Sequence, residues 1–300
     1  MDRECSPRTE QAERLSPLSN HPYSHSSGPI ASPSQCRNSM CRPGLIFVNA
    51  DDWGRDAVTT DRTLDCVRSG SVSSVSAMVF MEDSERAAAL AREHAIESGL
   101  HLNLTTPFSA PNCPPAIKDQ QGKIADYLGR HRLAQIIFHP GLRSAFAYVV
   151  QAQIEEFRRL YGSVPTRIDG HHHMHLSMNV MLQGLLPRDT IVRRNFSFEA
   201  RERSIWNRYY RRAVDRLLAR RHRLTDYFFS LAPLQPEERL RRIFALSRHH
   251  IVEVEVHSVN QDEHHFLTGT GIKRVAGEVK IEPPSAISWQ RAAAATSRKE

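Results

Sequence analysis

Short apolar runs alternate with longer amphipathic stretches along the chain from Gly44 onward. Residues 45–48 (LIFV) form an apolar run that stops at the polar sequence Asn49-Ala50-Asp51-Asp52, which is typical of a buried parallel strand followed by a loop. Further strands are expected at residues 71–80, 100–104, 166–169, 190–192 and 251–256. Helices are expected at residues 58–69, 84–97 with Ser84 as N-cap, 145–161, 204–223 and 236–246. This alternation predicts an α/β protein with a parallel sheet or barrel.

Three segments lack the alternation. Residues 1–43 contain nine serines and six prolines and almost no apolar periodicity, so we expect a disordered extension. Residues 106–130 contain prolines and are expected to form a loop region, and residues 272–300 show no clear final strand or helix. We therefore expect an extension at 1–43, one folded domain at 44–282 and a tail at 283–300.

The composition fits a globular protein without a membrane span. Of the 300 residues, 40% are hydrophobic and 24% are charged, and a chain of this length can bury a sizeable core. No run approaches the ~20 apolar residues needed to cross a bilayer, which excludes an integral membrane protein. No apolar stretch follows the charges of the N-terminus, so we expect no secretory signal. The five cysteines are odd in number and lack a CxxC pair, which favours a reducing, cytoplasmic setting over a disulfide framework or zinc ribbon.

The net charge of +7 is concentrated in one window of the chain. Residues 201–223 contain nine arginines against Glu202 and Asp215, so this window alone carries +7. It predicts a helix whose outer face is solvated and which packs through Trp206, Tyr209 and Tyr210. The alternative is a surface for an anionic membrane, for an acidic glycan, a phosphate or a lipid-linked sugar, or, less favoured, for nucleic acid.

Polar side chains gather where four of the predicted strands end. Asp51 and Asp52 follow the first strand, His101 lies in a later one, the run at residues 171–175 (HHHMH) follows another, and His257 follows the last. Because the carboxyl ends of parallel strands converge on one face of an α/β fold, these segments predict a shared site.

The residue types at these strand ends favour metal-assisted hydrolysis. Two histidines and one carboxylate can hold a metal while leaving positions open for water and substrate. A second carboxylate beside the metal can act as a base. Adjacent residues of an extended segment point in opposite directions, so Asp51 and Asp52 can take different roles.

The histidine run admits several interpretations. If residues 171–175 are extended, His171, His173 and His175 share one side; if they begin a helix, His171 and His175 share a face. The run could also be solvated, and an Asp-Asp pair by itself suits a turn or a helix cap. His101 and His257, taken singly, suit structural positions, so it is the joint pattern that favours a site.

Three motifs resemble those of the YdjC-like carbohydrate deacetylase family, which is related to the polysaccharide deacetylases. The sequence Asn49-Ala50-Asp51-Asp52-Trp53-Gly54 resembles the NADDFG opening of that family. Residues 99–105 (GLHLNLT) resemble its GxHxxLT segment, and residues 169–175 (DGHHHMH) resemble its DxHxHxH segment. The resemblance runs from about Gly44 to about Leu267.

The resemblance implies an irregular (β/α) barrel of the polysaccharide deacetylase type and the removal of an N-acetyl group from an amino sugar. By the family motifs, Asp52, His101 and His171 would ligate a divalent metal ion, Mg²⁺ or Zn²⁺, and Asp51 would be the general base. His257 stands where the family has a histidine at a strand end that can act as general acid. The family usually has proline after that histidine, where this chain has Ser258.

Further side chains are candidates for the same site. Arg193 or Arg194, after the strand at 190–192, could supply a cation that keeps Asp51 ionised, or either could be a surface charge. Trp53 could stack on a sugar face or pack in the core. We count His173, Arg193 and Trp53 as candidates for substrate binding.

The preferred function is therefore a metal-dependent hydrolase that removes N-acetyl groups from an amino-sugar-containing carbohydrate or glycolipid. The alternatives are a metal hydrolase of another amide or ester, and a binding protein that uses residues 201–223. A second copy of the chain, in a homodimer, is also among the expected partners.

Overall fold

The computed structural model describes residues 44–130, 133–197, 205–287 and 289. The extension expected at 1–43, residues 201–204 of the arginine-rich window and residues 290–300 of the expected tail lie outside the described residues.

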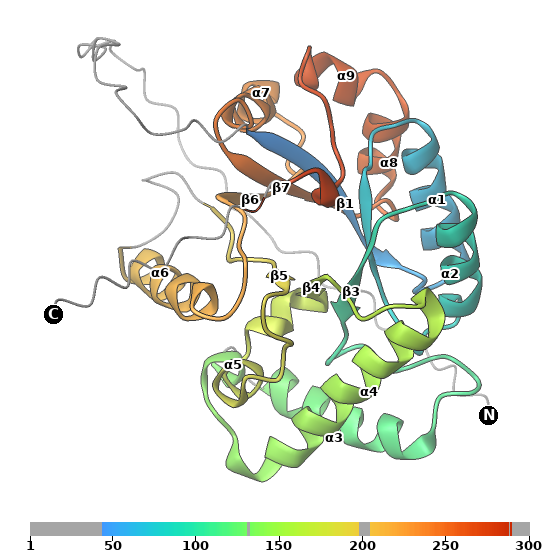
Figure 1. The fold of residues 1–300 in the computed structure, drawn as a ribbon, viewed down its shortest axis with the longest axis vertical. Helices are drawn as coiled ribbons and strands as arrows, with labels where there is room; N and C mark the ends of the chain where they lie inside the picture. Colours follow the sequence, from blue (N-terminus) through green and yellow to red (C-terminus); the bar gives the residue numbers. More distant parts are fainter. Residues whose placement is uncertain (1–43, 131–132, 198–204, 288, 290–300) are drawn as a thin grey trace, which may run out of the picture. The chain divides into compact units, whose positions relative to one another are not determined.

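Seven parallel strands form one curled sheet in the order β5-β4-β3-β2-β1-β7-β6 (Figure 1). The strand at the centre, β1, pairs with β2 and β7, which place Val75 and Val256 opposite Ala50. The strands are β1 (Leu45–Trp53), β2 (Ser74–Ala77), β3 (Ser98–Leu102), β4 (Arg167–Gly170), β5 (Ile191–Val192), β6 (Tyr227–Ser230) and β7 (Ile251–Val256).

Hydrogen bonds span the space between the two edge strands, β5 and β6. The backbone N–H of Val192 donates to the carbonyl of Arg223 at 2.9 Å, and the N–H of Arg223 donates to the carbonyl of Thr190 at 3.0 Å. Further along, the N–H of Ser197 donates to the carbonyl of Phe228 in β6 at 2.8 Å. The curl and these bonds give the irregular (β/α) barrel that the sequence predicts.

Helices surround the outside of the curled sheet (Figure 1). Most of them connect one strand to the next, as the alternation of strand and helix signals predicts. The helices are α1 (Ala57–Arg68), α2 (Ser84–Glu93), α3 (Pro115–Arg130), α4 (Arg143–Tyr161), α5 (Met178–Gln183), α6 (Ile205–Ala219), α7 (Glu237–Leu246), α8 (Gln261–Thr268) and α9 (Gly271–Ala276).

The two faces of the sheet differ in polarity, because successive side chains of a strand point to opposite faces. In β1, Ile46, Val48 and Ala50 are buried in the main hydrophobic core between sheet and helices. The alternate residues Asn49 and Asp51 are also buried, but they belong to the opposite, inner face of the curl. Burial of apolar residues on one face therefore leaves the inner face available for polar groups.

Several sequence expectations need correction. Residues 106–130, expected as a loop, contain helix α3, which begins with Pro115 in the first turn, where proline is tolerated. Ser84 is the first helical residue of α2 rather than its cap, and its hydroxyl donates to the carbonyl of Met78 at 3.0 Å. Helix α6 ends at Ala219, four residues before the expected end.

The carboxyl-terminal part of the described chain is more regular than the sequence suggests. Residues 271–276 form helix α9, and Ile281 forms a parallel bridge with Ile46 at the start of β1. Ile287 is buried against Phe47 and Ile251, so packing continues beyond residue 282. Short elements of this kind carry a weak periodic signal, which explains why the sequence did not predict them.

Candidate active site

The inner face of the sheet carries a buried network of charged side chains. Arg193, just after β5 at one edge, contacts Asp51 of β1 and Glu253 of β7. Because these strands lie far apart in the sheet, the contacts must cross the inside of the curl. Of the predicted strand-end residues, Asp51, Asp52, His101 and His171 lie close together at the carboxyl end of the barrel.

Asp52, His101 and His171 form the tightest group in this network. Asp52 Oδ1 lies 2.8 Å from His171 Nδ1 and 3.2 Å from His101 Nε2. Both distances are short, yet among the described residues Asp52 Oδ1 has no partner with hydrogen-bond geometry. A buried carboxylate oxygen placed between two imidazole nitrogens is the arrangement of ligands around a common cation. These three residues fit a divalent metal ion.

The other atoms of this group are held by protein contacts. His101 Nδ1 lies 2.7 Å from Asp169 Oδ1, and a carboxylate at one imidazole nitrogen leaves the other free to ligate. Arg167 Nη1 donates to Asp169 Oδ2 at 2.7 Å. Arg55, at the rim, donates to the second oxygen of Asp52 at 3.3 Å. His101 is thus oriented from behind by Asp169, and Asp52 is contacted from the rim by Arg55.

A second group of possible ligands, formed by Asp51, His101 and Asp169, also lies close together. Its carboxylates are already neutralised: Arg193 contacts both Asp51 and Asp169, and Arg167 contacts Asp169. Among the described residues, the one arginine or lysine that pairs with the Asp52 group is the half-exposed Arg55. The Asp52 group is therefore the better metal site.

Electrostatics favour a cation at this point. Among the described residues, five buried carboxylates of the inner face lie with two buried arginines, Arg167 and Arg193. Burial lowers the pKa of His101, but Asp51, Asp169 and Asp52 outweigh burial and raise it to about 10. Burial and, to a smaller extent, Asp169 raise the pKa of Glu253, and burial, Asp51 and Glu253 raise that of Glu255. The carboxylates thus stabilise positive charge at His101, which a bound cation would supply in place of the imidazole proton. The carboxylates are Asp51, Asp52, Asp169, Glu253 and Glu255.

Asp51 is held in a fixed orientation beside the Asp52 group. Arg193 donates from Nη1 to Oδ2 at 2.7 Å and from Nη2 to Oδ1 at 2.8 Å, and the Asn49 amide donates to Oδ1 at 2.8 Å. Burial raises the pKa of Asp51, but Arg193 and then His101 more than offset this, so the pKa lies below its usual value. Arg193 is thus the buried cation of the sequence hypothesis. Its donors face carboxylates, which favours a role in holding Asp51 over direct contact with substrate.

The histidine run adopts neither conformation considered from the sequence. Residues 171–176 form a 3₁₀ turn in which His172 and His173 have left-handed backbones, with φ of 53° and 58°. Asp52 is also left-handed, with φ of 64°. Each such residue costs roughly 1–2 kcal/mol, and strain of this kind is typical of functional sites. The turn buries His171 and His175 while His172 points outward.

The outward members of the run differ in their surroundings. His172 Nδ1 lies 3.0 Å from the Thr105 hydroxyl at the surface. His173 is half-buried, and its ring meets those of Phe196 and Phe228 edge-on, with centroids 4.7 and 5.9 Å away. This position beside the site keeps His173 a candidate for substrate contact.

The other candidates occupy distinct environments. Trp53 is fully buried in the main core, a position that favours packing over stacking on a sugar. Arg194 pairs with Asp215 of α6 at 2.8 Å and is not near Asp51. His257 is half-buried directly after β7, one position beyond the paired residues Ala50 and Val256, and its N–H donates to Glu263 at 2.9 Å. Since Asp51 and His257 directly follow these paired residues, they lie at the same level of the sheet.

Sequence reasoning missed four members of the network: Arg167, Asp169, Glu253 and Glu255. The signal for the two glutamates is the alternation in residues 251–256 (IVEVEV), which places both on one face of a strand that is otherwise apolar. Asp169 stands directly before the histidine run, but nothing in the sequence pairs it with His101.

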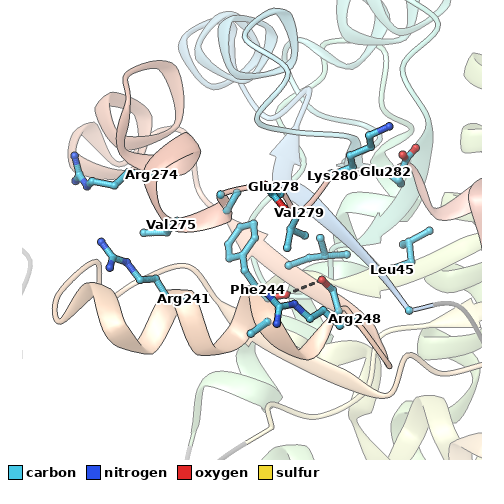
Figure 2. Close-up of a pocket in the computed structure, with 16 residues that line it drawn as sticks. Leu45, Arg241, Phe244, Arg248, Arg274, Val275, Glu278, Val279, Lys280 and Glu282 are labelled. Atoms are coloured by element: carbon cyan, nitrogen blue, oxygen red, sulfur yellow. Dashed lines mark hydrogen bonds between the residues drawn. The ribbon is translucent and has the colours of Figure 1, made fainter.

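A separate hollow of about 810 Å³ lies at the opposite, amino-terminal end of β1 (Figure 2). Leu45 and Phe244 form part of its wall, with Arg241 and Arg274 at one side. Both arginines contact Glu237, Arg241 at 3.4 Å and Arg274 at 3.0 Å. Since its walls come from α7, the start of β1 and residues 274–282, it is distinct from the strand-end site.

The fold and the site together define an irregular (β/α) barrel with a candidate metal centre at the carboxyl ends of its strands. A sequence model of the YdjC-like protein family matches residues 45–288, and the chain belongs to this family. The match confirms the resemblance carried by the three motifs.

Comparisons with individual proteins agree with this placement. Chitooligosaccharide deacetylases of Yersinia pestis (strain Pestoides F) and Yersinia pseudotuberculosis (serotype O:1b, strain IP 31758) are each 33% identical to this chain over 134 residues. The aligned part is 44% of this chain and 51% of theirs, so the chain spans about half the length of the curated relatives it matches.

A solved structure supports the fold. The crystal structure of an Enterococcus faecalis V583 protein, to which cellobiose-phosphate cleavage has been ascribed, superposes with a TM-score of 0.56. It covers 80% of this chain and 97% of that protein at 19% sequence identity, and at this level of identity it supports the barrel alone. Among the described helices, none is long and apolar enough to cross a membrane.

Proposed function

We propose that this chain is a divalent-metal-dependent deacetylase that removes N-acetyl groups from an amino-sugar-containing carbohydrate. The observation that carries the proposal is the convergence of Asp52, His101 and His171 beside Asp51, which Arg193 holds in place. The deacetylase relatives supply the substrate class. A lipid-linked form of such a sugar is an included case.

Asp52, His101 and His171 would hold the metal ion. When bound, a divalent cation supplies Lewis acidity, which polarises an amide carbonyl and makes a nearby water molecule more acidic. Of the two ions expected, Zn²⁺ suits a site with two imidazoles better than Mg²⁺, which prefers oxygen ligands.

Asp51 would act as the general base. It is ionised at neutral pH, because its two oxygens face the Arg193 guanidinium, and it lies beside the metal group rather than in it. The bidentate contact with Arg193 fixes the orientation of the Asp51 carboxylate and keeps it ionised. Asp51 can therefore accept a proton from an attacking water molecule.

His257 would act as the general acid. It follows β7 at the level of Asp51 in β1, so the two side chains can flank a substrate bound over the strand ends. Its imidazole is half-exposed, as a group that must protonate a departing amine requires.

The alternative is a metal hydrolase of another amide or ester, because the same site chemistry serves many substrates. Acetate release from N-acetylglucosamine oligomers, compared with hydrolysis of simple acetyl esters, separates the two. The proposal requires faster turnover, by kcat/KM, of the acetylated amino sugar. Preferential hydrolysis of the esters would favour the alternative.

We expect Asp169→Asn to weaken metal binding. Asp169 orients His101 through Nδ1, and loss of such a supporting carboxylate typically costs about 10–100-fold in metal affinity. Zn²⁺ affinity, measured by competition with a chromogenic chelator on protein whose fold is verified by circular dichroism, tests this. An unchanged affinity would show that His101 is oriented by other contacts.

A further inference from the structure

Helix α6 has a well-defined inner side. Asp215 is the one acid within this helix, and it is turned inward, 2.8 Å from Arg194 Nη2 and 3.0 Å from the Asn195 amide. Val214 and Leu218 are buried beside it. The carboxylate of Asp215 thus pairs with Arg194 on the inner side of the helix and does not neutralise the arginines on its outer side.

The outer side of α6 is a stripe of arginines. Tyr209, Arg212 and Arg216 of α6 and Arg220, in the turn directly after it, are exposed and follow the three- and four-residue spacing of one helix face. At ~1.5 Å per residue the stripe is roughly 16 Å long. Tyr209 is 59% exposed and so does not pack the helix onto the core as the sequence suggested, Tyr210 is 36% exposed, and the side chain of Trp206 lies outside the described residues.

Several surface arginines of the described chain pair with acids, whereas those of this stripe do not. Arg86 pairs with Asp61, and Arg159 pairs with Glu156, each at 2.7 Å. Within the part of the chain that the structure describes, Arg212, Arg216 and Arg220 form no ion pair with a carboxylate. The face therefore keeps its full positive charge, in a chain whose net charge of +7 equals that of this window.

We propose that the outer face of α6 binds the anionic surface of a lipid membrane. The face offers arginine side chains for lipid phosphates and exposed tyrosines, whose rings suit the headgroup region. Between the arginines lie the exposed Ala213 and Ala219, which let the helix approach a planar surface closely.

Sequence-specific reading of nucleic acid fits this face less well. Base edges are read chiefly by bidentate arginine, lysine, asparagine and glutamine side chains that enter a groove. The exposed stripe lies along the side of a helix fixed by its inner residues, and it offers no asparagine or glutamine among its described members. Lipid headgroups, by contrast, can rearrange around a fixed row of charges.

Cosedimentation of the full chain with vesicles tests the proposal. We expect binding to vesicles of phosphatidylcholine with about a third phosphatidylserine at low salt, little binding to pure phosphatidylcholine, and loss of binding at high salt. Each arginine contributes about fivefold to such binding. The triple variant Arg212→Gln, Arg216→Gln, Arg220→Gln should therefore partition roughly 100-fold more weakly.

A matched control removes the same charge elsewhere on the surface. The triple variant Arg143→Gln, Arg158→Gln, Lys273→Gln should bind vesicles nearly as well as the unchanged chain. Equal binding by the α6 variant, or equal losses in both variants, would overturn the proposal, as would binding to a 20-base-pair DNA duplex without binding to vesicles. Circular dichroism and acetate release from a soluble acetylated sugar show that both variants remain folded and keep the inner site.

Discussion

Asp51→Asn should lower kcat by about 10²–10⁴-fold while leaving the bound metal and KM nearly unchanged. Asparagine has almost the shape of aspartate but cannot accept a proton in the same way. Asp51 lies outside the Asp52 group and is held by Arg193, so metal ligation does not depend on it. Steady-state acetate release and metal analysis of the same preparation measure both expectations.

Two other outcomes for Asp51→Asn would assign Asp51 a different role. Loss of metal, with partial recovery of the rate on adding Zn²⁺, would make Asp51 a ligand in the second group with His101 and Asp169. An unchanged rate would remove it from catalysis altogether. Asp56→Asn is the control, since Asp56 caps α1 by accepting from the N–H of Thr59, and asparagine caps as well as aspartate.

Arg193→Met should destabilise the fold by about 3–5 kcal/mol, because it removes the central cation of a buried network. Arg193 contacts Asp51, Glu253 and, at 3.2 Å each, Asp169 and Glu255. Methionine fills a similar volume but leaves these carboxylates without their common partner. Chemical denaturation at neutral pH measures the loss.

The neighbouring arginine supplies the matched control for this change. Arg194→Met removes a partly exposed contact with Asp215 and should cost about 1 kcal/mol. Similar losses for the two substitutions would contradict the view that the inner network depends on Arg193. A large loss confined to Arg193→Met would support it.

The sequence predicted the fold where the signal was local and strong. The run at residues 251–256 forms β7 at the expected residues, and the long amphipathic stretch at 145–161 forms α4. Helix α3 was missed because Gly122 and Gly129 interrupt its apolar pattern, although Pro115 at its start is a recognised signal. Helix α8 also had a signal, in Asn260 followed by Asp262 and Glu263.

The site was predictable to the extent that it follows strand ends. Asp52, His101 and His171 lie together because β1, β3 and β4 are parallel and close in the sheet. The left-handed backbones of His172 and His173 were not predictable, since no local signal requires them at histidine. The pairing of Arg193 with Asp51 depends on the curl of the sheet, which brings residues 142 positions apart into contact. Such contacts are set by tertiary structure and leave no periodic pattern in the sequence.

The central claim is that Asp52, His101 and His171 hold the metal ion on which deacetylation depends. Its most direct test is acetate release from N-acetylglucosamine oligomers by chelator-stripped protein during titration with Zn²⁺. For the unchanged chain the account predicts no acetate release without metal and full recovery of release at one equivalent of Zn²⁺. His171→Ala should not recover. His172→Ala, whose altered side chain points outward, should bind one equivalent of Zn²⁺ like the unchanged chain. Full activity of the stripped protein, or stoichiometric metal in folded His171→Ala, would contradict it.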